Sequence, residues 1–386
     1  MQIPMPYIFI HLLLAQANEA APAAEGDLRA RSVAVAEEVV RKLPGNARAL
    51  RDLGKVHERF GAVEPAVKAY RDSLAAEPEQ PGVLRDLGAL LSPSAPEEAA
   101  PLLREALRRN RGLTGAHTHL GLLLAGQGRH RTAVDEFREE IRNRSADART
   151  YQALGRSLEA LGLHPQAENS FEEARRLKTG ADSAPGSAQA SSPSEDLRSA
   201  ALTFLAAGET LQKGGMREDA RTALGEALRH DPRLDDARRL LVESLREDRK
   251  VDEAIARCRE GLAVTRNPEL LYLLAGLLIE KETYPEAASL LEEVIRRDRS
   301  GGSAQRELAR LILRKKVSGD PARALQLAEE AVKRNPHAQN FGILGWARHV
   351  NGDLPGARSA LETAISLDSK NTGYRALLAE LGEKRL

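Results

Sequence analysis

Apolar and polar positions along this chain follow the spacing of short helices that are separated by turns. The stretch HLGLLLAGQGRHRTAVDEF, residues 119–137, shows the arrangement. An apolar helical segment is followed by a turn that contains glycine, and then by a second helical segment with an alanine at position 133 and an aromatic residue at 137. The stretch predicts one helix, a tight break and a second helix.

The same arrangement recurs at a nearly constant interval. Leu-Gly pairs occur at residues 53–54, 87–88, 120–121 and 154–155, with spacings of 34, 33 and 34 residues. Each pair is followed by an alanine and, four positions later, by a bulky residue. These are Ala66 with Tyr70, Ala99 with Leu103, Ala133 with Phe137, and Ala167 with Phe171. A fixed period of this length indicates a repeat architecture.

Helix packing explains the residue types. Gly or Ala at the closest crossing of two antiparallel helices lets the backbones approach, while Leu and the aromatic residue interdigitate around that contact. A second group of glycines lies seven residues after the small residue of each first helix, where a left-handed C-terminal cap permits the chain to reverse. They are Gly61, Gly128, Gly162, Gly215 and Gly352.

The pattern resembles the tetratricopeptide repeat, and Pro78, Pro232 and Pro336 fall where repeats of that family end. A weaker form continues to the C-terminus, with an insertion in the turn RKKVSGD, residues 314–320. Residues 371–385 resemble the capping helix that such arrays need. The resemblance implies an all-α fold, a right-handed α-solenoid of about nine helix-turn-helix repeats in two arrays.

Residues 179–196, TGADSAPGSAQASSPSED, have the composition of a flexible linker. We therefore predict an N-terminal array at 26–178, with a half repeat plus four repeats, and a C-terminal array at 197–386, with five repeats plus a capping helix. The alternative is one continuous superhelix with a long inserted loop.

The N-terminal segment predicts export. The apolar run YIFIHLLL, residues 7–14, precedes the small-x-small sequence AQA at 15–17, so residues 1–17 are expected to be a signal peptide. The protein would then be periplasmic or secreted. The alternatives are a first helix that packs on the array or a misassigned start codon, and in either case the protein would be cytoplasmic.

Composition and charge argue against several function classes. The 57 basic and 56 acidic residues nearly cancel, so that no global field recruits nucleic acid or an anionic membrane. No other apolar run approaches the roughly 20 residues of a membrane span. We expect no nucleic-acid partner and no stable membrane span, although an RNA-binding helical-repeat protein is the alternative reading.

The sequence contains none of the compact catalytic motifs, and we predict that the protein is not an enzyme and holds no cofactor and no metal. An enzyme with an unrecognised site is the alternative. His117 and His119 lie two positions apart and so point to different faces of a helix, which does not suit metal ligation. Cys258 occupies a core position of its repeat and is expected to be a buried, unreactive thiol.

The resemblance implies that partners bind the concave surface, which the first helix of each repeat forms. In that family, the residues that face the groove are at the second, fifth, ninth, twelfth and thirteenth positions of each repeat. Carried over, these positions are Arg48, Arg51 and Lys55 in the first repeat, Thr118, Leu122 and Ala125 in the third, Arg149, Gln152 and Arg156 in the fourth, and Tyr272, Ile279, Arg306, Arg310, Arg314, Trp346 and His349 in the C-terminal array.

These residues favour a scaffold that binds protein or peptide partners, with a role in cell-envelope assembly or secretion if the leader is real. Arginine beside an aromatic ring can hold a carboxylate while the ring covers an apolar side chain, so we expect acidic partner segments. The alternative is that Arg306, Arg310 and Arg314 form a solvated stripe and that Trp346 packs on a neighbouring helix.

Overall fold

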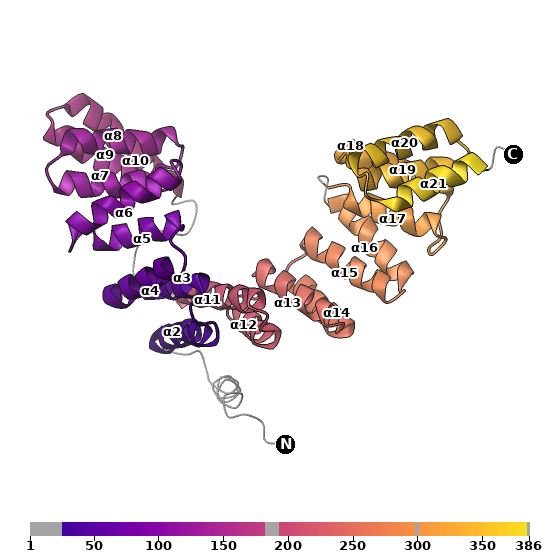
Figure 1. Cartoon of the computed structure of the whole chain (residues 1–386), viewed down its shortest axis with the longest axis horizontal. Coiled ribbons are helices and arrows are strands. Elements are labelled where there is room, and N and C mark those ends of the chain that lie inside the picture. The colour runs from indigo at the N-terminus through magenta and orange to yellow at the C-terminus, as the bar shows by residue number, and fades with distance from the viewer. Residues whose placement is uncertain (1–24, 182–192, 298–300, 384–386) are drawn as a thin grey trace, which may run out of the picture. The chain divides into compact units, whose positions relative to one another are not determined.

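Every secondary-structure element in the described part of the chain is an α-helix. The computed structural model describes residues 25–181, 193–297 and 301–383 (Figure 1). Helices that are consecutive in each repeat pack against each other, which gives nine helix pairs in these ranges, from α3–α4 to α19–α20. The predicted all-α solenoid of about nine repeats is thereby confirmed.

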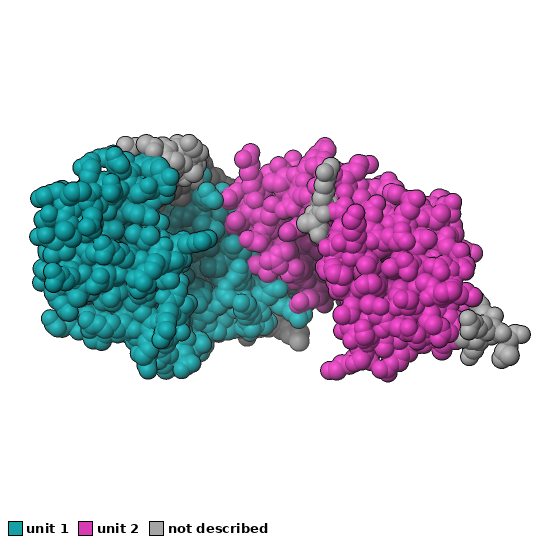
Figure 2. Space-filling view, turned by 90° about the horizontal axis from the view of Figure 1, so that it is seen from above, with its two compact units in different colours: residues 1–230 teal, residues 231–386 magenta. Residues whose placement is uncertain are grey.

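The fold divides into two compact units, one ending at His230 and one beginning at Asp231 (Figure 2). Unit 1 contains α2 (Glu25–Lys42), α3 (Ala47–Arg59), α4 (Val63–Ala76), α5 (Pro81–Leu91), α6 (Pro96–Arg109), α7 (Ala116–Gly126), α8 (His130–Arg142), α9 (Ala148–Ala160), α10 (His164–Ala181), α11 (Pro193–Lys213) and α12 (Arg217–His230). Unit 2 contains α13 (Asp235–Glu247), α14 (Val251–Val264), α15 (Pro268–Glu280), α16 (Tyr284–Arg297), α17 (Ser303–Leu313), α18 (Pro321–Arg334), α19 (Ala338–Val350), α20 (Leu354–Leu367) and α21 (Thr372–Glu383).

Glycine sets the helix spacing in the repeats, as the sequence predicts. A Cβ atom on Gly121 of α7 would lie 2.6 Å from Cε1 of Phe137 on α8, and one on Gly54 would lie 2.5 Å from the Tyr70 ring. Both rings are fully buried. A larger residue would therefore push the two helices of the pair apart.

The predicted turn, insertion and cap are also found. The five turn glycines named above have φ angles between 70° and 84°. The insertion forms the loop between α17 and α18. Helix α21 covers the end of the last pair, where Tyr374 and Leu381 join a core with Leu361 of α20.

The first pair after the predicted linker belongs to unit 1. Helices α11 and α12 share a core with α2 and α3, to which Val39, Ala49, Ala207, Leu211 and Ala223 contribute. The boundary between the two units therefore lies between α12 and α13. The sequence predicts it earlier in the chain, at residues 179–196. Helix α10 extends to Ala181 and α11 begins at Pro193, so both ends of that segment are helical.

Polar contacts fix α11 and α12 on α2 and α3. Nζ of Lys42 lies 2.6 Å from Oδ2 of Asp219, and the Thr210 hydroxyl lies 3.2 Å from Oδ2 of Asp52. The Arg59 guanidinium donates to the Ser199 carbonyl at 3.0 Å. Helix α11 thus packs beside α2 and α3, although roughly 150 residues separate these helices along the chain.

Candidate binding groove

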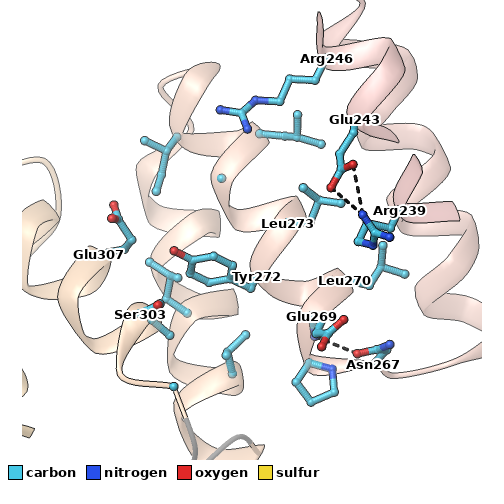
Figure 3. Close-up of a pocket in the computed structure, with 18 of the residues that line it drawn as sticks. Arg239, Glu243, Arg246, Asn267, Glu269, Leu270, Tyr272, Leu273, Ser303 and Glu307 are labelled. Atoms are coloured by element: carbon cyan, nitrogen blue, oxygen red, sulfur yellow. Dashed lines mark hydrogen bonds and ion pairs between the residues drawn. The ribbon is translucent and has the colours of Figure 1, made fainter. Parts of the chain in front are cut away.

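A groove with a volume of about 600 Å³ lies on unit 2. Its walls and floor come mainly from the first helices of three successive repeats, α13, α15 and α17 (Figure 3). Residues 301–302 and two side chains of α16 complete the lining. The cavity is large enough to hold several side chains of a bound segment.

Local capping holds α15 against α13. The Asn267 side chain caps α15 by accepting from the Glu269 N–H at 2.8 Å, as is usual for Asn at a helix start. The same side chain donates to Oδ2 of Asp235 at 2.8 Å, and the Thr265 hydroxyl lies 3.1 Å from Oδ1 of Asp235. One carboxylate therefore links the N-terminal ends of the two helices.

The groove floor is apolar. Leu270 and Leu277 of α15 and Leu291 and Val294 of α16 are buried beneath it, and Tyr272 is half-buried above them. A Cβ atom added at Gly276 would have no heavy atom within 4 Å, because this glycine borders the open groove. An apolar side chain of a partner can therefore contact the floor without moving the protein.

Carboxylates outnumber guanidinium groups in the lining, by six to three. The acidic residues are Asp235, Asp236, Glu243, Glu269, Glu280 and Glu307, and the basic residues are Arg239, Arg246 and Arg310. Each arginine is held by a carboxylate of the groove: Arg239 by Glu243 at 3.2 Å, Arg246 by Glu280 and Arg310 by Glu307. The lining itself therefore carries an excess of negative charge, which Arg306, outside the lining and 3.5 Å from Glu307, partly offsets.

Tyr272 lies between the charged walls. Figure 3 shows its hydroxyl end on the side of α17 that carries Glu307, opposite Arg239 and Glu243 of α13. Burial raises the pKa of Tyr272, and the nearby Glu307 carboxylate raises it further, while Arg306 and Arg310 oppose the shift. Its hydroxyl is therefore protonated at neutral pH and is available as a hydrogen-bond donor.

The structure places only some of the sequence-predicted residues of unit 2 in the groove lining. Tyr272, Ile279 and Arg310 line the groove. Arg306 of α17 is not part of the lining, but its Nε lies 3.5 Å from Oε1 of the lining residue Glu307. Its Nη1 donates to Oδ1 of Asn340 at 3.2 Å and lies 3.4 Å from Nε2 of His337.

Three further predicted residues lie outside this lining. Arg314 is exposed just after the end of α17, and Trp346 and His349 are half-buried on α19. Of the expected row of arginines beside Trp346, only Arg310 lines this groove, and Trp346 itself does not. Their role in partner binding stays a prediction.

In unit 1, two of the three predicted residues of the first repeat, Arg48 and Arg51, are already engaged. Arg48 pairs with Glu209 of α11, and its Nε lies 3.7 Å from Oδ2 of Asp52. Arg51 lies 3.1 Å from the same aspartate. Lys55, Arg149 and Arg156 are exposed and have no ion-pair partner within the described ranges.

The acidic lining residues follow from a register that the sequence already provides. Counting from Leu241 as position seven of its helix puts Asp236, Arg239, Glu243 and Arg246 at the second, fifth, ninth and twelfth positions. In the next repeat, Glu269 and Glu280 fall at the second and thirteenth positions. The same positions that select Tyr272 therefore select most of the acidic groups.

The remaining candidate residues have local structural roles. His117 Nδ1 lies 2.7 Å from Glu136. Among the residues that the structure describes, no cluster of three or more His, Cys, Asp and Glu side chains could hold a metal ion. Cys258 is fully buried, as predicted, and burial raises the pKa of its thiol to about 12. A protonated, inaccessible thiol is a poor nucleophile.

Comparisons with known families identify the repeats. One model described as tetratricopeptide repeat matches residues 16–81, 94–148 and 205–270, and a second with the same description matches 318–381. No curated protein matches the sequence. Within the described ranges, none of the helices is long and apolar enough to cross a membrane.

Several solved structures are similar to parts of the chain. MamA is 22% identical, with coverage of 39% of this chain and 89% of that chain and a TM-score of 0.36. YrrB, described as a TPR protein with an unusual peptide-binding site, is 19% identical, with coverage of 48% and 92% and a TM-score of 0.39. For pilF of Pseudomonas aeruginosa the identity is 19%, the coverage 60% and 97%, and the TM-score 0.41.

Proposed function

We propose, since this chain belongs to the tetratricopeptide repeat family, that it is a non-catalytic scaffold that binds a segment of a partner protein in the groove of unit 2. The family consists in general of such scaffolds. The site is chosen on one observation, which is the open apolar floor that α15 forms. Tyr272 and Gly276 border this floor, and charged residues of α13 and α17 flank it.

The geometry of this groove supports a peptide ligand. An apolar floor offers contact area to one or two hydrophobic side chains, and polar groups along the walls fix orientation. The excess of carboxylates also argues against RNA, because phosphates would be repelled. A scaffold role therefore fits the groove better than nucleic-acid binding does.

The first experiment fills the groove without disturbing the fold. In Gly276→Leu the new side chain enters open space, and replacing glycine inside a helix favours the helix by about 1 kcal/mol. Gly225 of α12 is a matched control, because a Cβ there also meets no heavy atom within 4 Å and it lies outside the groove.

Peptides are selected on the full chain from a random library displayed on phage. We expect peptides that bind the wild type and Gly225→Leu and that fail to bind Gly276→Leu, while circular dichroism shows equal helicity for all three. Selected peptides that bind Gly276→Leu as tightly as the wild type would move the site away from this groove.

An exported location is a separate proposal. The predicted signal peptide, residues 1–17, lies outside the described residues. Its support is the apolar run and the AQA sequence alone. Sequencing of the N-terminus of the protein purified from its native cells tests it: a chain that begins at Asn18 supports export, and one that retains residues 1–17 argues for the cytoplasm.

A further inference from the structure

We infer that the groove of unit 2 selects a partner segment that combines apolar residues with lysine or arginine. This inference rests on the proposed function and names the chemistry of its ligand. It differs from the acidic partner that the sequence alone predicts, because most of the charged side chains in the lining are carboxylates.

The negative charge is only partly neutralised within the groove. Arg239 is the one guanidinium near two carboxylates, Glu243 at 3.2 Å and Asp236 at 3.6 Å. The Glu269 side chain is exposed and has no ion-pair partner within the described ranges. Asp235 receives hydrogen bonds from the neutral Asn267 and Thr265 side chains, and Arg238, outside the lining, is close enough to interact with its charge. Cationic side chains of a partner would complete these pairs.

The three arginines do not offer an acidic partner a free site. Arg246 and Arg310 are each paired with one carboxylate, and Arg239 with two. A carboxylate that enters the groove would have to displace one of these partners and would then face the remaining acidic groups. Like charges brought together at an interface oppose binding, whereas opposite charges favour it.

The arrangement suits long basic side chains. Carboxylates lie on α13 and α17 at the two sides of Tyr272, Glu269 and Glu280 lie on α15 itself, and the floor is apolar (Figure 3). The aliphatic part of lysine or arginine can cover the floor and the tyrosine ring while the charged end reaches a wall. Apolar residues of the same segment then contact Leu273 and Leu277.

A buried amide without a hydrogen-bond partner borders the groove. Gln305 lines the groove and is only 2% exposed, and its Nε2 atom has no hydrogen-bond partner among the described residues. Buried polar groups in proteins are nearly always paired. The Nε2 atom has almost no exposed surface, so it can donate to a main-chain carbonyl of a bound segment only after the side chain turns toward the groove.

The test uses the full chain and three fluorescent probe peptides of equal length. All share one leucine frame, and the positions between the leucines carry lysine, glutamine or glutamate. Fluorescence anisotropy at low and at physiological salt measures their affinities. We expect the lysine probe to bind most tightly and to lose affinity with added salt, since screening weakens exposed charge pairs.

Charge reversal in the groove provides the matched comparison. Asp236→Lys together with Glu269→Lys changes two exposed residues of the lining. We expect this variant to bind the lysine probe about tenfold more weakly and to bind the glutamate probe more tightly. Glu292→Lys, at an exposed position of α16 outside the lining, is the control and should leave the order of the probes unchanged.

The possible results separate the two proposals. If the glutamine or glutamate probe binds the wild type as tightly as the lysine probe, the basic partner is wrong and the groove remains a peptide site. If no probe binds and the phage selection yields no peptide sensitive to Gly276→Leu, both the basic partner and the proposed function fail.

Discussion

The amide nitrogen of Gln305 is a residue-scale case in which stability and binding are predicted to change in opposite directions. It is buried without a hydrogen-bond partner in the described structure, so it costs stability in the free protein. Methionine has a similar shape and no such donor. We expect Gln305→Met to raise the free energy of unfolding by about 1 kcal/mol, as urea denaturation would show.

The same variant should bind the groove peptides about fivefold more weakly, which corresponds to the loss of one hydrogen bond. Gly225→Leu, which also alters a helix but not the groove, serves as the control for nonspecific effects of added stability. Equal peptide affinity of Gln305→Met and wild type would show that this amide has no part in recognition.

His117 and His119 of α7 are expected to have opposite effects on the pH dependence of stability. Burial lowers the pKa of His119, and Arg149 and Arg85 lower it further against the influence of Asp86 and Glu140. The unfolded chain, with a pKa near 6.5, then takes up a proton before the folded chain does. Stability is therefore lost as the pH falls through about 6.5.

His117 provides the internal comparison. Its hydrogen bond with Glu136 raises its pKa, so the stability it contributes is fully present below pH 6.5 and is lost as the pH rises through the folded-state pKa. We expect His119→Gln to lose less stability than the wild type between pH 8 and pH 5.5, and His117→Gln to lose more. Urea denaturation at both pH values measures this, and parallel curves for all three proteins would contradict it.

At the scale of elements, local sequence predicts the helix pairs and fails for contacts between distant helices. The crossing of Gly121 with Phe137 and the turn at Gly128 follow from spacing within one repeat. The pair between Arg48 and Glu209 joins residues 161 positions apart, and no periodicity of the sequence indicates it. Arg48 consequently faces α11, although its register position is one that faces the groove.

The candidate groove was predictable in its position and less so in its charge. Register alone places Tyr272 and Arg310 on the concave side, and the structure puts both in the lining. Register does not reveal which charges are already paired. Glu307 pairs with Arg310, and Arg306 contacts Glu307, Asn340 and His337, so two arginines that the sequence presents as free cations are engaged within the protein.

At the scale of the whole molecule, the division of the fold determines where the chain can be cut. Repeat proteins are stabilised by contacts between neighbouring elements, so a cut is tolerated only where few contacts cross it. The predicted linker would release residues 197–386 as one array. The structure instead puts α11 and α12 in unit 1, where Ala207, Leu211 and Ala223 are buried against α2 and α3.

Two fragments therefore distinguish these boundaries. We expect residues 231–386 expressed alone to be monomeric and helical, to unfold cooperatively and to bind the lysine probe as the full chain does, because the groove lies wholly within unit 2. Residues 197–386 retain the groove but expose the apolar face of α11 and α12, so this fragment should associate or aggregate. Light scattering and urea denaturation of both fragments measure the difference. If the longer fragment is instead the better-behaved one, α11 and α12 belong to the C-terminal array, and the boundary at residues 179–196 is the physical one.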